Sequence, residues 1–275
     1  MRQATDVNHP TPYPELDAVL AELVARVEAM LGDRLVGAYL QGSFAVGDFD
    51  VDSDVDFVIV TEDDLGSGEA AALTAMHEEV YRLPSTWAQH LEGSYFPREV
   101  LRANREPREE LWYLDHGSQV LVRSTHCNTS IVRWVLREQG VALAGPPPAM
   151  LVDPIPVEVL RREISATIRD WGTEILRDPS AFENRFFQGF ILLSYCRMLH
   201  DLHTGRPGSK RAGAEWAKSH FGGGWPPLID RAWETRPDPA TSVRQEPDRA
   251  DFEATLRFVA EVMQRATEYV DREQR

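Results

Sequence analysis

The stretch LVGAYLQGSFAVGDFDVDSDVDFVIV, residues 35–60, decides the fold. Its two apolar runs, 34–41 and 55–60, are rich in β-branched and aromatic residues and are bounded by Gly and Asp, which is typical of strands. Between them every second residue from Asp48 to Asp56 is an aspartate. Neighbouring carboxylates repel one another. The segment is therefore either a solvated loop or a place where some of these groups meet a cation.

The last two aspartates of the series differ from the others in their position. Side chains two apart on a strand point the same way, so Asp54 and Asp56 would aim at one point while Val55 faces the core. Mg²⁺ is usually held by one or two carboxylates together with substrate phosphates. The remaining three fall in the connecting loop, where we expect them to be solvated: Asp48, Asp50 and Asp52.

A Gly-Ser turn precedes the aspartates, in LQGSFAVGD at 40–48. Gly42 would let the backbone approach a phosphate closely, and Ser43 offers an N–H and a hydroxyl, with a helix expected to follow. Two alternatives stay open, because alternating aspartates in a glycine-containing loop could bind calcium structurally and D-x-D alone arises by chance. The order strand, Gly-Ser, D-x-D, strand is far more specific than D-x-D alone.

Composition limits the classes of function. The chain has 275 residues, enough for one large or two modest domains, and is 43% hydrophobic and 27% charged, as globular proteins are. A net charge of −15 argues against nonspecific binding to nucleic acid or anionic membrane and suits a cationic partner, although an acidic surface also serves solubility. Two distant cysteines give neither a disulfide framework nor a zinc site. With no apolar leader or run of about 20 residues, we expect a cytoplasmic protein.

Apolar periodicity and a proline cluster predict the domain organisation. The cluster AGPPPAMLVDPIP, 144–156, is the best candidate boundary, because prolines stiffen linkers and interrupt regular structure. Before it we expect helices at 15–31, 69–82 and 128–139 and a third strand at 86–97. Beyond it we expect helices at 156–177, 183–203, 211–220 and 250–272, with loops at 222–227 and 236–248. The fold class is therefore α+β, with a mixed sheet in residues 1–150 and an all-helical bundle in residues 151–275.

The motifs resemble those of a known group of enzymes. GSFAVGDFDVDSDVD, 42–56, resembles the signature of the polymerase-beta-type nucleotidyltransferase superfamily, in which D-x-D follows Gly-Ser by about ten residues. GVALAGPPPAMLVDPIP, 140–156, and YCRMLHDLHTGRPGSKRAGAEWA, 195–217, are similar to segments of the aminoglycoside adenylyltransferases that modify streptomycin and spectinomycin. The resemblance runs from about residue 35 to 221 and is weak over 61–125.

That resemblance implies transfer of AMP from ATP-Mg to a hydroxyl of the drug, with release of pyrophosphate. Residues 1–150 would be the nucleotidyltransferase domain, and residues 151–275 would close over nucleotide and acceptor. Asp54 and Asp56 would hold two Mg²⁺ ions, and Glu92, in HLEGSYFP, would be the general base. The alternative for Glu92 is an exposed carboxylate at a strand edge, since the sequence around it departs from the family pattern. Gly42 and Ser43 would hold the β- and γ-phosphates.

The resemblance also assigns cations in the helical half. Arg197 and Lys210 stand where the family places residues that contact phosphate. An unpaired guanidinium in an apolar helix is costly, so Arg197 needs either a phosphate or a buried acid as its partner. For Lys210 the alternative is a solvated lysine in a Gly/Pro loop.

Acceptor contacts follow less directly from the family. Trp171 is the counterpart of a substrate-binding Trp, or else a core residue. The acidic contacts do not map to single positions, and the candidates are Asp178, Glu183 and Glu174. His200, Asp201 and His203 have helical metal-ligand spacing but are interpreted as a polar cap, and the aromatics of RFFQGF, 185–190, as bundle core.

The expected partners are ATP and a cationic aminoglycoside, with no nucleic acid and no membrane, for a monomeric enzyme. Three alternatives are open: adenylylation of another small molecule, adenylylation of a protein hydroxyl, or an inactive nucleotide- or calcium-binding module. The hydroxyl modified and the preferred nucleotide are left open.

Overall fold

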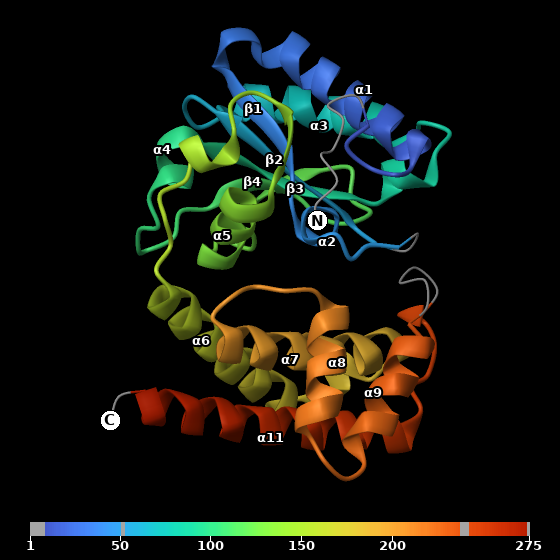
Figure 1. Ribbon diagram of the computed structural model, residues 1–275. Helices are drawn as coiled ribbons and strands as arrows, with labels where there is room; N and C mark the ends of the chain where they lie inside the picture. The colour runs from blue at the N-terminus through green and yellow to red at the C-terminus, as the bar shows by residue number, and fades with distance from the viewer. Residues whose placement is uncertain (1–8, 51–52, 237–241, 274–275) are drawn as a thin grey trace. The chain divides into compact units, whose positions relative to one another are not determined.

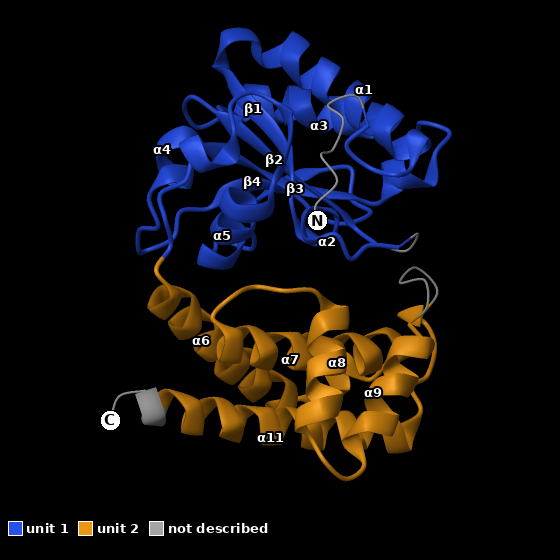
Figure 2. Cartoon of the chain, in the orientation of Figure 1, with its two compact units in different colours: residues 1–155 blue, residues 156–275 orange. Residues whose placement is uncertain are grey.

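The computed structural model describes residues 9–50, 53–236 and 242–273. The chain forms two compact units, residues 1–155 and residues 156–275 (Figure 2). The boundary lies inside the proline cluster, five residues after the expected position at 150. The first unit contains both strands and helices, and the second contains helices (Figure 1). The predicted α+β class is confirmed.

The first unit is built on one six-stranded sheet with the order β5-β4-β3-β2-β1-β6. β2 and β3 run parallel, and every other neighbouring pair is antiparallel. β2 is buried on both faces, which explains why its sequence is a nearly continuous apolar run. The strand bounds are β1 Leu35–Leu40, β2 Val55–Thr61, β3 Leu91–Pro97, β4 Leu111–Leu114, β5 Leu121–Ser124 and β6 Val141–Ala144.

Helices cover both faces of this sheet and create two hydrophobic cores. On one face α1 (Pro14–Leu31) and α3 (Ser67–Tyr81) pack over alternate residues of β1 and β2, in a cluster that includes Leu23, Phe57 and Leu73. On the other face α4 (Arg98–Arg102) and α5 (Ser130–Gln139) contribute Leu101 and Leu136, which pack with Val58 of β2. Side chains that alternate along β2 therefore contribute to both cores.

The sheet departs from expectation at three places. Thr86–Gln89 forms a 3₁₀ turn instead of the first half of the predicted third strand, which begins at Leu91. β4 and β5 lie where we predicted no element. β6 completes the edge beside β1, directly before the proline cluster. These short strands are stabilised by pairing rather than by a local pattern.

His77 is a polar side chain inside the first core, and it makes stability depend on pH. It lies on α3, its Nε2 is 2.8 Å from the Tyr95 hydroxyl, and its ring stacks on Phe57. Burial lowers the pKa of His77 from 6.5 to about 4. Between these values the unfolded chain binds a proton that the folded chain excludes, so stability falls as the pH falls through this window.

We expect wild type to lose about 3 kcal/mol of unfolding free energy between pH 7 and pH 4 through His77 alone. A His77→Gln variant, which keeps a polar group near Tyr95, should lose correspondingly less. Urea unfolding of both proteins at pH 7, 6 and 5 measures the difference, and His220→Gln, at an exposed histidine, is the control. Parallel pH curves for wild type and His77→Gln would contradict the assignment.

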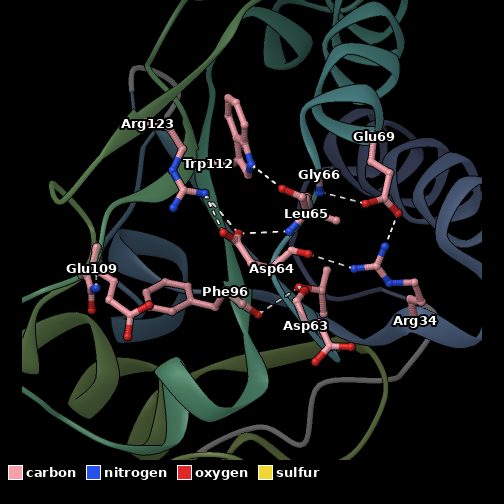
Figure 3. Close-up of polar contacts among 12 residues, drawn as sticks. Arg34, Asp63, Asp64, Leu65, Gly66, Glu69, Phe96, Glu109, Trp112 and Arg123 are labelled. Carbon is pink, nitrogen blue, oxygen red and sulfur yellow. Dashed lines mark hydrogen bonds and ion pairs between the residues drawn. The ribbon is translucent and has the colours of Figure 1, made fainter.

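A polar network ties β4 and β5 to the loop after β2 (Figure 3). The Arg123 guanidinium donates from Nη1 to both oxygens of Asp64, at 3.1 and 3.0 Å, and Trp112 Nε1 donates to the Leu65 carbonyl at 3.0 Å. On the other side Arg34 pairs with Glu69, which also accepts from the Gly66 backbone N–H. The network fixes the loop between β2 and α3, at the end of β2 opposite to Asp56.

The second unit is a bundle around α7, which contacts α6, α8, α9 and α11. Gly213 explains one close approach, because a Cβ there would lie 2.4 Å from the Arg197 Cα on α7. No helix among the described residues is long and apolar enough to cross a membrane. The helix bounds are α6 Val157–Arg177, α7 Arg185–Thr204, α8 Lys210–His220, α9 Trp225–Glu234 and α11 Arg249–Glu273.

The bundle matches the predicted helices within about two residues, except for α9. The segment 222–227 was expected to be a loop, but α9 begins at Trp225 and carries its prolines in the first turn. Proline is tolerated there because the first N–H groups of a helix have no intrahelical acceptor. Part of the expected loop 236–248 lies outside the described residues.

Candidate active site

Three carboxylates gather at one end of the central strands of the sheet. Asp54 directly precedes β2, Asp56 is its second residue, and Glu92 is the second residue of β3. The parallel register places Asp56 opposite Glu92. The backbone of Asp56 is fixed from both sides, since its carbonyl also accepts from the Gln41 N–H at 2.9 Å. The residues predicted as metal ligands and base thus lie on two adjacent strands.

The Gly-Ser turn contacts this group directly. β1 ends at Leu40 and the five-residue helix α2 (Gly42–Val46) begins two residues later. Gly42 has φ +60°, and a Cβ there would lie 1.9 Å from Oδ2 of Asp56. Ser43 Oγ is buried and has no hydrogen-bond partner within the described part of the chain. Glycine is therefore required beside the Asp56 carboxylate, and the Ser43 hydroxyl is available to a ligand.

Glu92 is mostly buried, with 15% of its side chain exposed, in contrast to a carboxylate at a strand edge. Burial raises its pKa, and the charges of Asp54 and Asp115 act in the same direction. A hydrogen bond of 2.6 Å from the Tyr113 hydroxyl opposes that rise. Glu92 is thus a carboxylate with increased proton affinity, as a general base requires.

Several residues that line this group were not predicted from the sequence. Tyr113 comes from β4, and its hydroxyl, which donates to Glu92, also lies 2.9 Å from Asp115 Oδ1. His116 and His90 lie beside Asp54, whereas His126 and Cys127 lie beside Glu92. The only local sequence feature that pointed to these residues was the turn LDHG, 114–117, after the short apolar run LWYL, 111–114. Recognising that run as a strand antiparallel to β3 would have brought its end to the start of β3.

The loop aspartates are less solvated than expected. Asp48 and Asp50 are half-buried, and Asp50 contacts Ser53. Its carboxylate accepts from Ser53 Oγ at 3.2 Å, while its N–H donates to the same oxygen at 2.9 Å. Asp52 lies outside the described residues. The Asp50 carboxylate is therefore held at least in part by Ser53.

The predicted phosphate contacts lie in the second unit. Arg197 is half-buried on α7. Burial raises the pKa of Asp201, and the positive charge of Arg197 opposes that rise. Lys210 opens α8 and lies with its Nζ 4.6 Å from the centre of the Phe190 ring. Asp201 accepts from the Gly208 N–H and lies 2.9 Å from His200 Nδ1, as expected of a polar cap.

The predicted acceptor contacts are also in this unit. Trp171 is half-buried, stacks on Tyr195 and meets the edge of Phe190. Asp178 and Glu183 are exposed at the end of α6 and the turn after it, as is Glu174. The expectation that the aromatics of 185–190 form bundle core was wrong, because each of the three is half-buried: Phe186, Phe187 and Phe190.

The arrangement in the first unit can bind a metal-triphosphate and accept a proton. Oxygen donors on β2 suit a hard divalent cation. The buried hydroxyl of Ser43, which has no partner among the residues described, adds a donor beside them, and Glu92 lies one strand away as a base.

Comparison with known proteins identifies the two units. Residues 20–109 match the family model of the nucleotidyltransferase domain. Residues 150–264 match the family model of the aminoglycoside adenylyltransferase C-terminal domain.

Individual relatives agree with these matches. The chain is 26% identical to a spectinomycin 9-adenylyltransferase of Staphylococcus aureus in a 205-residue alignment that covers 70% of this chain and 74% of the relative. It is 22% identical to an aminoglycoside (3'') (9) adenylyltransferase of Shigella flexneri in a 240-residue alignment that covers 78% of this chain and 83% of the relative.

A solved structure shares the fold. The crystal structure of spectinomycin adenyltransferase AAD(9) from Enterococcus faecialis, with ATP and spectinomycin, covers 89% of this chain and 98% of its own, with a TM-score of 0.66 at 14% identity. The two domain matches follow each other in the order of the two units. The chain therefore combines a region that matches the nucleotidyltransferase domain with one that matches the aminoglycoside adenylyltransferase C-terminal domain.

Proposed function

We propose that this protein transfers AMP from ATP-Mg to a hydroxyl of an aminoglycoside antibiotic of the streptomycin or spectinomycin type, releasing pyrophosphate. The observation that carries the proposal is the contact between the Gly-Ser turn and the D-x-D strand, where only glycine fits beside Asp56. Relatives named for spectinomycin and aminoglycoside adenylylation support the class of acceptor.

The residues of the first unit fit a nucleotide-bound Mg²⁺ site. Asp54 and Asp56 would hold two Mg²⁺ ions, which would neutralise the triphosphate charge and support in-line displacement. Ser43, whose buried hydroxyl has no partner in the described chain, would donate to the β- or γ-phosphate. Gly42 keeps the turn close enough for that contact.

Glu92 would take the proton of the acceptor hydroxyl. Its increased proton affinity, due mainly to burial, favours that transfer while Tyr113 keeps it oriented. Burial and the Glu92 charge raise the pKa of Tyr113, so the phenol stays protonated and remains a donor.

The second unit would supply the remaining contacts. Arg197 and Lys210 would neutralise phosphate charge, and Trp171 would pack on the acceptor. Asp178 and Glu183 would bind its ammonium groups. A net charge of −15 favours encounter with a cationic drug. We propose that the enzyme acts as a cytoplasmic monomer.

A pyrophosphate-release assay with ATP and Mg²⁺ tests the proposal. Streptomycin and spectinomycin are added separately, and the product is checked by mass for one added adenylyl group. We expect release only with one or both drugs present. If neither drug supports release although ATP-Mg binds, the acceptor assignment is wrong. Labelling of the protein itself would then favour a protein hydroxyl as acceptor.

A further inference from the structure

Two histidines converge on Asp54 in a manner that Mg²⁺ binding does not require. His90 directly precedes β3, and His116 lies in the turn after β4, which is antiparallel to β3. His116 Nε2 lies 3.3 Å from Asp54 Oδ1 and 3.3 Å from His90 Nδ1. One donor atom from each of these three residues lies within 4.8 Å of the other two.

The two distances suit atoms arranged around a metal ion better than direct hydrogen bonds. N–H···O bonds in proteins cluster at about 2.9–3.0 Å, and one His116 nitrogen offers at most one hydrogen to two neighbours. Zinc bonds to nitrogen or oxygen of about 2.0–2.2 Å, at tetrahedral angles, separate the ligand atoms by roughly 3.3 Å. The observed separations match that value.

We propose that Asp54, His90 and His116 form a binding site for a divalent transition-metal ion of the zinc class. Imidazole nitrogen is a preferred ligand of Zn²⁺ and Co²⁺, whereas Mg²⁺ prefers oxygen. Three protein ligands leave a fourth position open to water or to a substrate donor. Because a carboxylate has two oxygens, Asp54 can belong to this site and to the nucleotide site.

Neighbouring groups hold the turn that carries His116. The Asp115 carboxylate accepts from the His116 N–H at 3.1 Å and lies 2.9 Å from the Tyr113 hydroxyl. The side chain of His116 is 28% exposed and that of Asp54 is 43% exposed, so an ion can reach them from solvent. Outer contacts of this kind orient metal ligands.

A second group nearby, formed by Glu92, His126 and Cys127, is the less favourable one. His126 is 66% exposed and its Nε2 is 3.8 Å from Glu92 Oε1. Burial raises the pKa of Cys127 to about 12, so the thiolate that a metal needs is costly to form. Thiolate ligation also has its own spectroscopic signature, which lets the test separate the two groups.

Cobalt titration of the intact, untagged protein tests the site without ATP or drug. We expect the intense visible absorption of tetrahedral Co²⁺ to appear on titration. It should disappear when Zn²⁺ is added, because Zn²⁺ displaces the Co²⁺. His116→Gln and His90→Ala should each weaken Co²⁺ binding by about tenfold or more, since even outer-shell changes cost 10–100-fold. His126→Ala and Cys127→Ser should leave the spectrum and affinity unchanged. Thermal melting establishes that each variant is folded.

Two results would overturn the assignment. One is weak, octahedral-type absorption that neither His116→Gln nor His90→Ala alters. The other is a sulfur-to-cobalt charge-transfer band that Cys127→Ser removes, which would place the ion at the second group. Neither result bears on AMP transfer, because no nucleotide is present. Loss of drug-dependent pyrophosphate release would likewise leave this site standing.

Discussion

Replacing Asp56 with asparagine is expected to lower kcat for drug-dependent AMP transfer by about three orders of magnitude in a folded protein. The change removes one negative charge from the oxygen donors at the start of β2 and leaves the shape of the side chain. Loss of several kcal/mol of charge stabilisation corresponds to about 10³ in rate. The backbone of Asp56 pairs with Glu92 on β3 and its carbonyl accepts from the Gln41 N–H after β1, so the sheet does not depend on its carboxylate. Initial rates of pyrophosphate release at saturating ATP-Mg measure the effect.

Asp50→Asn is the matched control for this change. It makes the same chemical substitution six residues earlier and keeps an oxygen that can accept from Ser53. We expect it to retain activity close to that of wild type. Equal losses in the two variants would mean that the acidic segment acts through its total charge, and that Asp56 has no special role.

The part of the site that could be predicted is the part encoded locally. β2 is apolar on both faces and begins at the D-x-D pair. The position of Asp56 could therefore be predicted from its neighbours in the sequence. The contact between Gly42 and Asp56 joins residues 14 positions apart, but the strand, turn and strand between them are each readable. The charge pattern alone did not reveal that Asp48 and Asp50 are half-buried, because their burial depends on contacts with Ser43 and Ser53.

The part that could not be predicted depends on sheet register. β4 has four residues, too few for a period of two to stand out, and only its pairing with β3 brings Tyr113 to Glu92 and His116 to Asp54. In the bundle, apolar periodicity placed the helices well. It does not distinguish full burial from half burial, and for that reason the prediction for Phe186 and Phe190 was wrong.

Replacing Gly42 with alanine is expected to lower kcat/KM for AMP transfer by about 100-fold or more with a small loss of stability. The new Cβ would lie 1.9 Å from Asp56 Oδ2 and 2.5 Å from its Cγ, so the carboxylate must rotate away. Misplacement of a catalytic group by about 1 Å can cost 10²-fold in rate. The left-handed backbone at φ +60° adds strain of about 1–2 kcal/mol. Kinetics and urea unfolding measure the two effects separately.

Gly47→Ala separates strain from collision, because Gly47 also has a positive φ, +77°, and a Cβ there would meet nothing within 4 Å. It should lose similar stability and keep most of its activity. Combining Gly42→Ala with Asp56→Asn then tests the route of the effect. If Gly42→Ala acts by displacing the Asp56 carboxylate, the double variant should be little slower than Asp56→Asn alone, since coupled residues are not additive. If the two losses multiply, Gly42 acts on the nucleotide independently of Asp56, and the contact between them is only a packing constraint.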